Sequence, residues 1–263
     1  MGSQAPREAP FMRRIQIWKE TAEAAYKIGA PPSLKFVPAD VEKAISRGWE
    51  TPIRIVDADC LDTARGMISR GLRPVVLNLS DDITAGGAVD IGSGAQEESL
   101  WRRTALCATQ TQDFYPLGRS LIYSPAVPVL RDTEQYDYAW LTKPWTVDFI
   151  ACPALKYPHW IATDEDPAGD LKPADKEELA ARLRLILDVA AKMGNDSVVL
   201  GPMGCGAWKN PPRAVARVFQ RVLPEYDGCF REIAIAALTT SGGAVVTNAR
   251  IFADMLMTPS ARL

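Results

Sequence analysis

The residues best placed to do chemistry lie between positions 85 and 98. Four glycines fall between Gly86 and Gly94, and they leave a loop with little side-chain bulk, so backbone N–H groups can come close to a ligand. Glu97 and Glu98 follow at once, at the start of a predicted helix. A backbone cradle for an anion, with two carboxylates at its rim, suits chemistry on a phosphorylated sugar.

Two neighbouring carboxyl groups can break a glycosidic bond at the anomeric carbon of a ribose. One acid protonates the departing oxygen as an oxocarbenium-like state forms, and it then takes a proton from the incoming water. That acid must be protonated near neutral pH, which a neighbouring carboxylate and an adjacent diphosphate both favour. The simpler interpretation of Glu97 and Glu98 is two charges in the first turn of a helix, where the dipole favours them. The glycine-rich loop directly upstream favours the catalytic interpretation.

A second glycine-rich turn, residues 201–212, also follows a predicted strand and opens a helix. Asn210 is a good helix N-cap, and Pro211 suits the first helical position. Strand ends in an α/β sheet collect ligands and helix N-termini favour phosphate, so two such loops at neighbouring strand ends would clamp a diphosphate. Either loop alone could be no more than a tight turn. Neither the Walker A pattern nor a single G-x-G-x-x-G is present in the first loop, which argues against kinases, simple nucleotide triphosphatases and dehydrogenases.

The elements that must position these loops alternate along the chain. Strands are predicted at residues 53–56, 74–79, 120–123, 146–151, 197–200 and 232–238, and helices at 11–29, 41–49, 61–69, 174–192, 211–223 and 248–255, with a further helix from Gln96. This alternation predicts an α/β fold of three layers, a mixed central sheet flanked by helices. Residues 1–50 are expected to form a helical extension packed on one domain, residues 51–263.

Some local expectations can be checked directly. The apolar face of the first helix is predicted to carry Ile15, Trp18, Ala22 and Tyr26. A loop is expected at residues 124–126, between two strands. Residues 152–174 hold four prolines and are expected to form a long surface loop.

Composition bounds the partners. The net charge of −2 gives no bulk attraction to nucleic acid or to an acidic membrane surface, so neither is expected to bind. No apolar run reaches about 18 residues, which argues against a membrane span. The five cysteines form no CxxC pair, which argues against a zinc knuckle. Their odd number and the absence of an apolar leader predict a reducing compartment, either cytoplasm or nucleus.

Together, these motifs resemble the signature of the bacterial-type poly(ADP-ribose) glycohydrolases. The Gly86-Gly87-Ala88 loop followed by Gln96-Glu97-Glu98 is similar to the family's triple glycine and Gln-Glu-Glu. Residues 204–211 are similar to its second phosphate loop, Gly-Cys-Gly-Val-Phe-x-Asn, and residues 248–252 resemble its closing segment. The matches come in the family order and span roughly residues 50 to 255.

The resemblance implies a macrodomain-like fold with an ADP-ribose cleft and a place in ADP-ribosylation and the DNA damage response. Carried over by position, Glu98 would be the catalytic acid and base, and Glu97 would position the ribose. The residues implied to bind ADP-ribose are Asp59, Asn78, Gly86, Gly87, Ala88, Gln96, Gly204, Cys205, Gly206, Ala207 and Trp208. Asp59, with Asp57 as a rival, would bind the adenine amino group, and Trp208 would pack over the ligand.

The sequence departs from the family at three places. Ala88 replaces the third glycine, Ala85 replaces a proline, and Asp81 stands where Asn or Ser is usual. An extra negative charge at Asp81 would weaken diphosphate binding unless it points away. Cys205 could act as a nucleophile at a helix N-terminus, but a small residue packed under the loop is the favoured interpretation.

The expected function is therefore an ADP-ribosyl glycohydrolase that needs no metal and no cofactor. It would cleave the ribose–ribose bond of poly(ADP-ribose), or the bond that joins ADP-ribose to protein, and would act as a monomer. One alternative is a reader module that binds ADP-ribose without cleaving it. Another is a hydrolase of a small ADP-ribose derivative.

Overall fold

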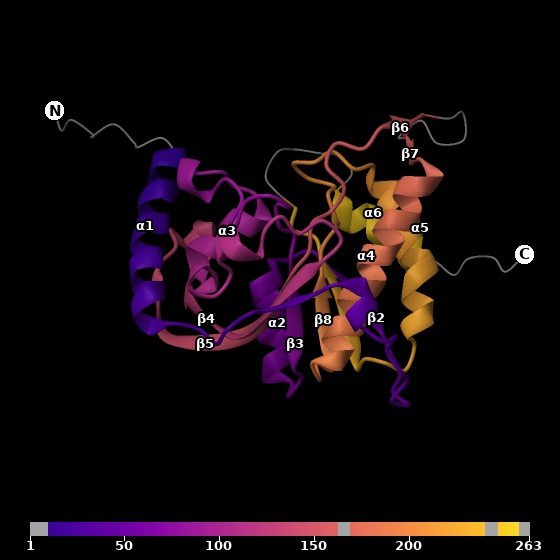
Figure 1. Ribbon diagram of the computed structural model, residues 1–263, viewed down its shortest axis with the longest axis horizontal. Helices are drawn as coiled ribbons and strands as arrows, with labels where there is room; N and C mark the ends of the chain where they lie inside the picture. Colours follow the sequence, from indigo (N-terminus) through magenta and orange to yellow (C-terminus); the bar gives the residue numbers. More distant parts are fainter. Residues whose placement is uncertain (1–9, 163–168, 240–246, 258–263) are drawn as a thin grey trace, which may run out of the picture.

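A seven-stranded mixed sheet forms the centre of the computed structural model, which describes residues 10–162, 169–239 and 247–257 (Figure 1). The strand order is β1-β4-β5-β3-β8-β9-β2. The bounds of these strands are β1 Leu34–Phe36, β2 Ile53–Val56, β3 Pro74–Asn78, β4 Leu121–Arg131, β5 Trp140–Ala151, β8 Ser197–Leu200 and β9 Glu232–Ala236. The pairs β5–β3–β8–β9–β2 are parallel and the pairs β1–β4 and β4–β5 antiparallel, so the expected mixed sheet is confirmed.

Helices cover both faces of the sheet, as the sequence predicts. They are α1 (Pro10–Ile28), α2 (Cys60–Ser69), α3 (Gln96–Arg103), α4 (Pro173–Lys192), α5 (Pro212–Val222) and α6 (Asn248–Leu256). Side chains of α1, α2 and α3 enter one buried cluster and those of α4, α5 and α6 enter the other, and Figure 1 shows α1 and α3 on the opposite side of the sheet from α4–α6. The three-layer architecture is therefore confirmed. Among the helices in the described ranges, none combines the length and apolar character that crossing a membrane requires.

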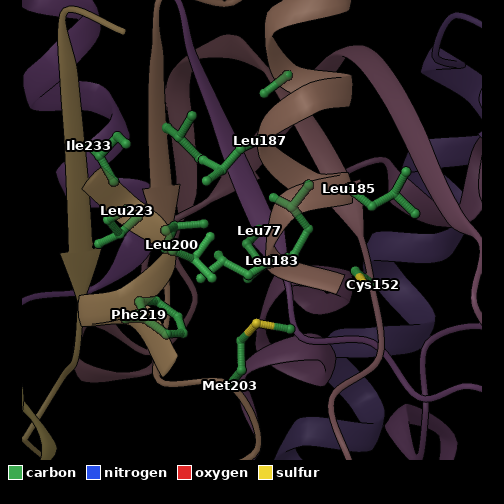
Figure 2. Close-up of a cluster of buried hydrophobic side chains, with 14 of the residues drawn as sticks. Leu77, Cys152, Leu183, Leu185, Leu187, Leu200, Met203, Phe219, Leu223 and Ile233 are labelled. Atoms are coloured by element: carbon green, nitrogen blue, oxygen red, sulfur yellow. The ribbon is translucent and has the colours of Figure 1, made fainter. Parts of the chain in front are cut away.

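Strand β3 shows why the sheet is buried on both faces. Val75 and Leu77 enter the cluster under α4 and α5, whereas Val76 enters the cluster under α2 and α3, because successive side chains of a strand point to opposite faces. Figure 2 shows Leu77 packed with Leu183 and other side chains of the cluster under α4 and α5. Burying one such leucine contributes roughly 1.5–3 kcal/mol. The strand ends that carry the glycine-rich loops are thus held in a rigid framework.

The carboxyl ends of β5, β3 and β8 lie next to one another. The strands are parallel, with Val76 paired with Phe149 of β5 and Val199 of β8. The two glycine-rich loops follow β3 and β8, and residues 152–158 follow β5. Three connections therefore meet at one edge of the sheet, the place where open α/β sheets bind ligands.

The helix expected at residues 41–49 does not form. The Ala44 N–H donates to Asp188 Oδ1 at 2.8 Å, and the Arg47 N–H donates to the Gly228 carbonyl at 2.8 Å. These N–H groups serve tertiary contacts instead of helix hydrogen bonds, so the segment runs irregularly after a short 3-10 turn, Pro38–Asp40. Tertiary partners here outweigh local propensity.

The buried face of α1 differs from the expected one. Ile17, Thr21 and Ala25 are buried, whereas Tyr26 is 68% exposed. The Thr21 hydroxyl donates to the Arg102 carbonyl at 2.8 Å, so a polar residue joins the contact face. The helix itself is confirmed. Trp18 and Ala22 of the expected face pack against the core cluster, so the predicted face is right in part and wrong at Tyr26.

The loop expected at residues 124–126 is part of the continuous strand β4. A bulge lies between Ser124 and Val127, where the pairing with β5 shifts. Ala126 adopts φ 47°, and its N–H donates to Asp148 Oδ1 at 2.8 Å, so a side chain replaces the missing ladder bond.

Two further elements are not predicted by the sequence pattern. Within the segment expected to be a loop, residues 152–174, strand β6 (Trp160–Ile161) pairs antiparallel with β7 (Asp170–Leu171), and residues 163–168 of the segment lie outside the described residues. Strand β1, within the first 50 residues, pairs with β4. The division of the chain at residue 50 stays a prediction, but the segment before it contributes a strand to the central sheet.

Candidate functional site

The helix that carries the acidic pair is fastened to the end of β3 by its first residue. Gln96 Oε1 accepts a hydrogen bond from the Leu79 N–H at 2.9 Å, and Gln96 Nε2 donates to the Leu77 carbonyl at 2.7 Å. Helix α3 has no side-chain N-cap of its own, since Ala95 occupies that position. The Gln96 amide therefore holds the start of α3 in register with the strand.

Glu97 is enclosed and held at both carboxylate oxygens. The residue is only 3% exposed. Its Oε2 accepts a hydrogen bond from the Asp81 N–H at 2.6 Å, and its Oε1 accepts one from Asn78 Nδ2 at 3.4 Å. Burial raises the pKa of Glu97 well above its ordinary value; the two N–H donors oppose this rise, and the neighbouring charge of Glu98 adds to it. Glu97 is thus a fixed carboxyl group with a strong tendency to keep its proton.

Glu98 is held at one oxygen only. Oε1 accepts from the Ala88 N–H at 3.0 Å. Oε2 is buried and accepts no hydrogen bond from any residue that the structure describes. A buried polar atom without a partner is costly, so a ligand or water that bonds to this oxygen would be favoured. The free oxygen of Glu98 is the one available for proton transfer.

The first glycine-rich loop lies directly against both carboxylates. A Cβ on Gly87 would stand 2.7 Å from Glu98 Oε1 and 2.9 Å from Glu97 Oε2, and one on Gly86 would stand 2.6 Å from the Trp101 ring. Both glycines adopt positive φ, 75° at Gly86 and 59° at Gly87. Ala88 adopts φ −104°, which alanine accepts freely, so the departure from a triple glycine fits the backbone.

The two glycine-rich loops differ in the N–H groups they leave free. In the first loop, the Gly87 N–H donates to the Thr84 carbonyl at 3.1 Å and the Ala88 N–H donates to Glu98. In the second, the N–H groups of Gly206 and Ala207 donate to no acceptor in the described parts of the chain. The Gly86 N–H of the first loop likewise donates to no acceptor in the described ranges, so each loop keeps part of the expected cradle of free N–H groups, one such group at Gly86 and two at Gly206 and Ala207.

Asn210 shapes the second loop from within. Its Nδ2 donates to the Leu155 carbonyl at 2.7 Å and to the Gly204 carbonyl at 3.2 Å. The N-cap of α5 is Pro211, so the prediction that Asn210 caps this helix is wrong. The amide bonds the loop to the segment after β5 instead, a contact that chain position alone could not show.

Helix α1 supports the first loop from outside. Trp18 Nε1 donates to Asp90 Oδ1 at 2.6 Å, and the Trp18 ring packs on Trp101 at 5.6 Å between centroids. The Arg14 guanidinium lies so close to Gly94 that a Cβ there would stand 2.6 Å from it. Trp18 is predicted only as part of the apolar face of the helix; its contact with the loop is not evident from the sequence, because the two are far apart in the chain.

The Asp81 carboxylate has partners of its own. Its Oδ1 accepts from the N–H groups of Ile83 and Thr84 at 2.8 and 3.0 Å, and its Oδ2 forms an ion pair with Lys156 at 2.7 Å. The Lys156 ammonium also lies 5.4 Å from the centre of the Trp208 ring. The extra negative charge therefore has a partner.

Asp57 and Asp59 lie between the end of β2 and the start of α2. Asp59 Oδ1 accepts from the Leu61 N–H at 2.9 Å and so caps α2, and Oδ2 pairs with Arg103 at 2.9 Å. Asp57 accepts from the Thr239 N–H at 2.7 Å. Each aspartate thus has a structural role.

Cys205 behaves as a packed side chain. Its Sγ contacts the Met203 carbonyl at 3.7 Å, and the residue packs on the core under α4 and α5. Burial raises the pKa of the Cys205 thiol above its ordinary value, which disfavours the nucleophilic thiolate. Within the described residues, no group of three or more His, Cys, Asp or Glu side chains is arranged to hold a metal ion.

Comparison with known proteins agrees with this geometry. The family model for the microbial-type PARG (poly(ADP-ribose) glycohydrolase) catalytic domain matches residues 20–132, which include the first loop and the acidic pair. No match was found among curated protein sequences.

Solved structures extend the likeness beyond that segment. The glycohydrolase of Thermomonospora curvata is 27% identical, with a TM-score of 0.75 over 93% of this chain and 99% of that one. The same enzyme bound to the inhibitor ADP-HPD is 26% identical, with a TM-score of 0.74 over 92% of this chain and 99% of that one. A point variant of the Deinococcus radiodurans glycohydrolase in complex with ADP-ribose is 25% identical, with a TM-score of 0.67 over 89% of this chain and 96% of that one. The chain is thus similar to the bacterial poly(ADP-ribose) glycohydrolases, in sequence over residues 20–132 and in fold over nearly its whole length.

Proposed function

We propose that this protein hydrolyses the O-glycosidic ribose bond of poly(ADP-ribose), or of ADP-ribose attached to protein. The observation that carries the proposal is the state of Glu98, whose Oε1 is held by the Ala88 N–H while its buried Oε2 has no partner among the described residues. The relatives described as glycohydrolases, one of them bound to ADP-HPD, support the same reaction.

The two glutamates take separate roles. Glu98 gives a proton to the departing ribose oxygen and then takes one from the attacking water, a step usually worth about 10²–10⁴-fold in rate. Glu97, fixed by Asn78 and the Asp81 N–H, positions the ribose next to the scissile bond. No step in this sequence calls on a metal or a cofactor.

The remaining contacts follow from the two loops. The side-chain-free surface of the first loop would lie along the diphosphate and the distal ribose, and the free N–H groups of the second loop would donate to the other side of the diphosphate. The residues proposed to bind are Asp59, Asn78, Gly86, Gly87, Ala88, Gln96, Gly204, Cys205, Gly206, Ala207 and Trp208. Of these, Gln96 acts through its hold on α3, and Asp59 through the oxygen that it shares with Arg103.

The test is turnover of poly- and mono-ADP-ribosylated substrates, with the products separated by chromatography. The wild-type protein should release ADP-ribose, and Glu98→Gln should bind ADP-ribose but release at least about 100-fold less. Glu23→Gln, at an exposed pair with Lys27 on α1, is the matched control and should keep full activity. Equal processing by the wild-type protein and Glu98→Gln would refute the mechanism.

The same assay separates the alternatives. A reader module would bind ADP-ribose in both proteins and release none, and a hydrolase of small derivatives would turn over free nucleotide analogues but not modified protein. We further propose that the protein acts as a monomer in a reducing compartment, the cytoplasm or the nucleus. Its five cysteines are all free, which supports the proposal of a reducing compartment.

A further inference from the structure

Lys156 lies between the two loops and touches residues on both sides. Its Nζ is 2.7 Å from Asp81 Oδ2 and 3.0 Å from Asp82 Oδ1, both in the connection that follows β3. On the other side, the ammonium lies over the Trp208 ring of the second loop at 5.4 Å. One cation thus serves two carboxylates and an aromatic face.

The backbone around Lys156 is bound to the second loop. The Tyr157 N–H donates to the Trp208 carbonyl at 3.1 Å, and Asn210 Nδ2 donates to the Leu155 carbonyl at 2.7 Å. Lys156 stands between these two anchor points. Because β3 lies between β5 and β8, residues 155–157 reach from the end of β5 to the loop after β8, and the Lys156 side chain reaches the connection after β3.

The Asp81 carboxylate cannot lose its charge easily. Burial raises the pKa of Asp81, but Lys156 and the N–H groups of Ile83 and Thr84 outweigh burial, so the pKa lies below its ordinary value. Asp81 is therefore ionised at neutral pH. The Asp81 N–H also donates to Glu97, so this residue adjoins the acidic pair directly.

We propose that Lys156 is a positioning residue of the diphosphate site, which offsets part of the negative charge of Asp81 and Asp82 and so lowers the repulsion that an anion meets between the loops. This inference rests on the proposed function. Without the ammonium, two fixed carboxylates would repel the diphosphate, and the link between the two loops would be lost. Lys156 thereby determines affinity for the anionic ligand, and the proton transfers of Glu98 do not depend on it.

The experiment measures binding of ADP and of ADP-ribose by calorimetry, together with KM and kcat for poly(ADP-ribose). Lys156→Met should weaken binding of both ligands about tenfold at low ionic strength, with KM raised and kcat nearly unchanged. Lys156→Arg should keep most of the affinity, since the positive charge remains. Lys192→Met, at the exposed end of α4, is the control and should match the wild-type protein.

The decisive variant combines Lys156→Met with Asp81→Asn and Asp82→Asn. An asparagine at position 81 can still accept from Ile83 and Thr84, so the turn survives while its charge is removed. Recovery of affinity in this triple variant supports the proposal. Failure to recover, with a normal melting temperature, would overturn it by showing that Lys156 acts through shape rather than charge.

The outcomes also separate this inference from the proposed function. If the wild-type protein releases ADP-ribose and Lys156→Met binds ADP as tightly as wild type, only the role of Lys156 is refuted. If ADP binding depends on Lys156 but no substrate is cleaved, the role of Lys156 stands and the glycohydrolase proposal fails. Absence of any binding of ADP or ADP-ribose by the wild-type protein would refute both.

Discussion

The Ala88 N–H donates to Glu98 Oε1 at 3.0 Å, so the glycine-rich loop and the acidic helix fix one another. The bond orients the Glu98 carboxylate and leaves its second oxygen without a partner in the described chain. It also occupies the N–H of Ala88, which therefore does not serve as an anion donor in this structure. A shift of the loop would therefore also move the Glu98 carboxylate and change its reactivity.

Gly87 should tolerate no side chain. Gly87→Ala places a methyl group against both carboxylates and a Cβ at φ 59°, which costs about 1–2 kcal/mol of folding free energy. Displacement of Glu98 by about 1 Å would lower kcat about 100-fold. Ala88→Gly is the matched control, because φ there is −104°; it should keep activity and lose about 0.4–1 kcal/mol. Substrate turnover and thermal unfolding of both variants check this, and a fully active Gly87→Ala would contradict it.

The sequence was sufficient for features that depend on local spacing. The buried strand β3, the glycines with positive φ and the acidic start of α3 are close in the chain, so their types and order predicted the site. Local hydrogen-bonding rules failed at Asn210 because a distant acceptor, the Leu155 carbonyl, captures its amide.

Long-range contacts explain the other differences. The bond from Trp18 to Asp90 joins residues far apart in sequence, and nothing in either local pattern announces it. The same holds for Lys156 and Asp81. The bulge near Ala126 follows from its bond to Asp148 on the neighbouring strand, which only the register of β4 and β5 brings within reach.

Glu97 should make stability depend on pH. Its pKa is higher in the folded than in the unfolded chain, so the folded state binds this proton more tightly, and that advantage is present below the unfolded pKa. The advantage is lost as pH rises from about 4.3, the unfolded value, toward the folded pKa. In Glu97→Gln this contribution is absent, and Asn78 Oδ1, which lacks a partner among the described residues, can accept from the new amide.

The measurement is denaturant unfolding of both proteins over a series of pH values. The free energy of unfolding of Glu97→Gln minus that of the wild-type protein should increase with pH, by at most about 1.4 kcal/mol per pH unit. Taking the difference removes the contribution of titrating groups that do not interact with Glu97. Parallel curves for the two proteins would show that Glu97 titrates alike in both states.

Gly206 and Gly204 should respond differently to the same substitution. A Cβ on Gly206 meets no atom within 4 Å, so Gly206→Ala should fold normally, yet its methyl group would obstruct approach to the free N–H groups of the second loop. A Cβ on Gly204 would overlap the Asn210 amide at φ 72°. We expect Gly206→Ala to weaken ADP-ribose binding at an unchanged melting temperature, and Gly204→Ala to lower that temperature. Undiminished binding by Gly206→Ala would argue against a ligand at this loop.

Asp59 and Arg103 form a partly buried ion pair, with side chains 18% and 3% exposed, and each should depend on the other. Arg103→Met leaves the Asp59 carboxylate unpaired and should destabilise the fold by about 3–5 kcal/mol. Asp59→Asn keeps the cap on α2, because asparagine caps helices well, and combining it with Arg103→Met should recover part of the loss.

The Asp59 carboxylate can still accept a further hydrogen bond. If Asp59 binds adenine, Asp59→Asn should therefore weaken binding of ADP-ribose but not of ribose 5-phosphate. Equal effects on both ligands in calorimetry would confine Asp59 to capping α2 and pairing with Arg103.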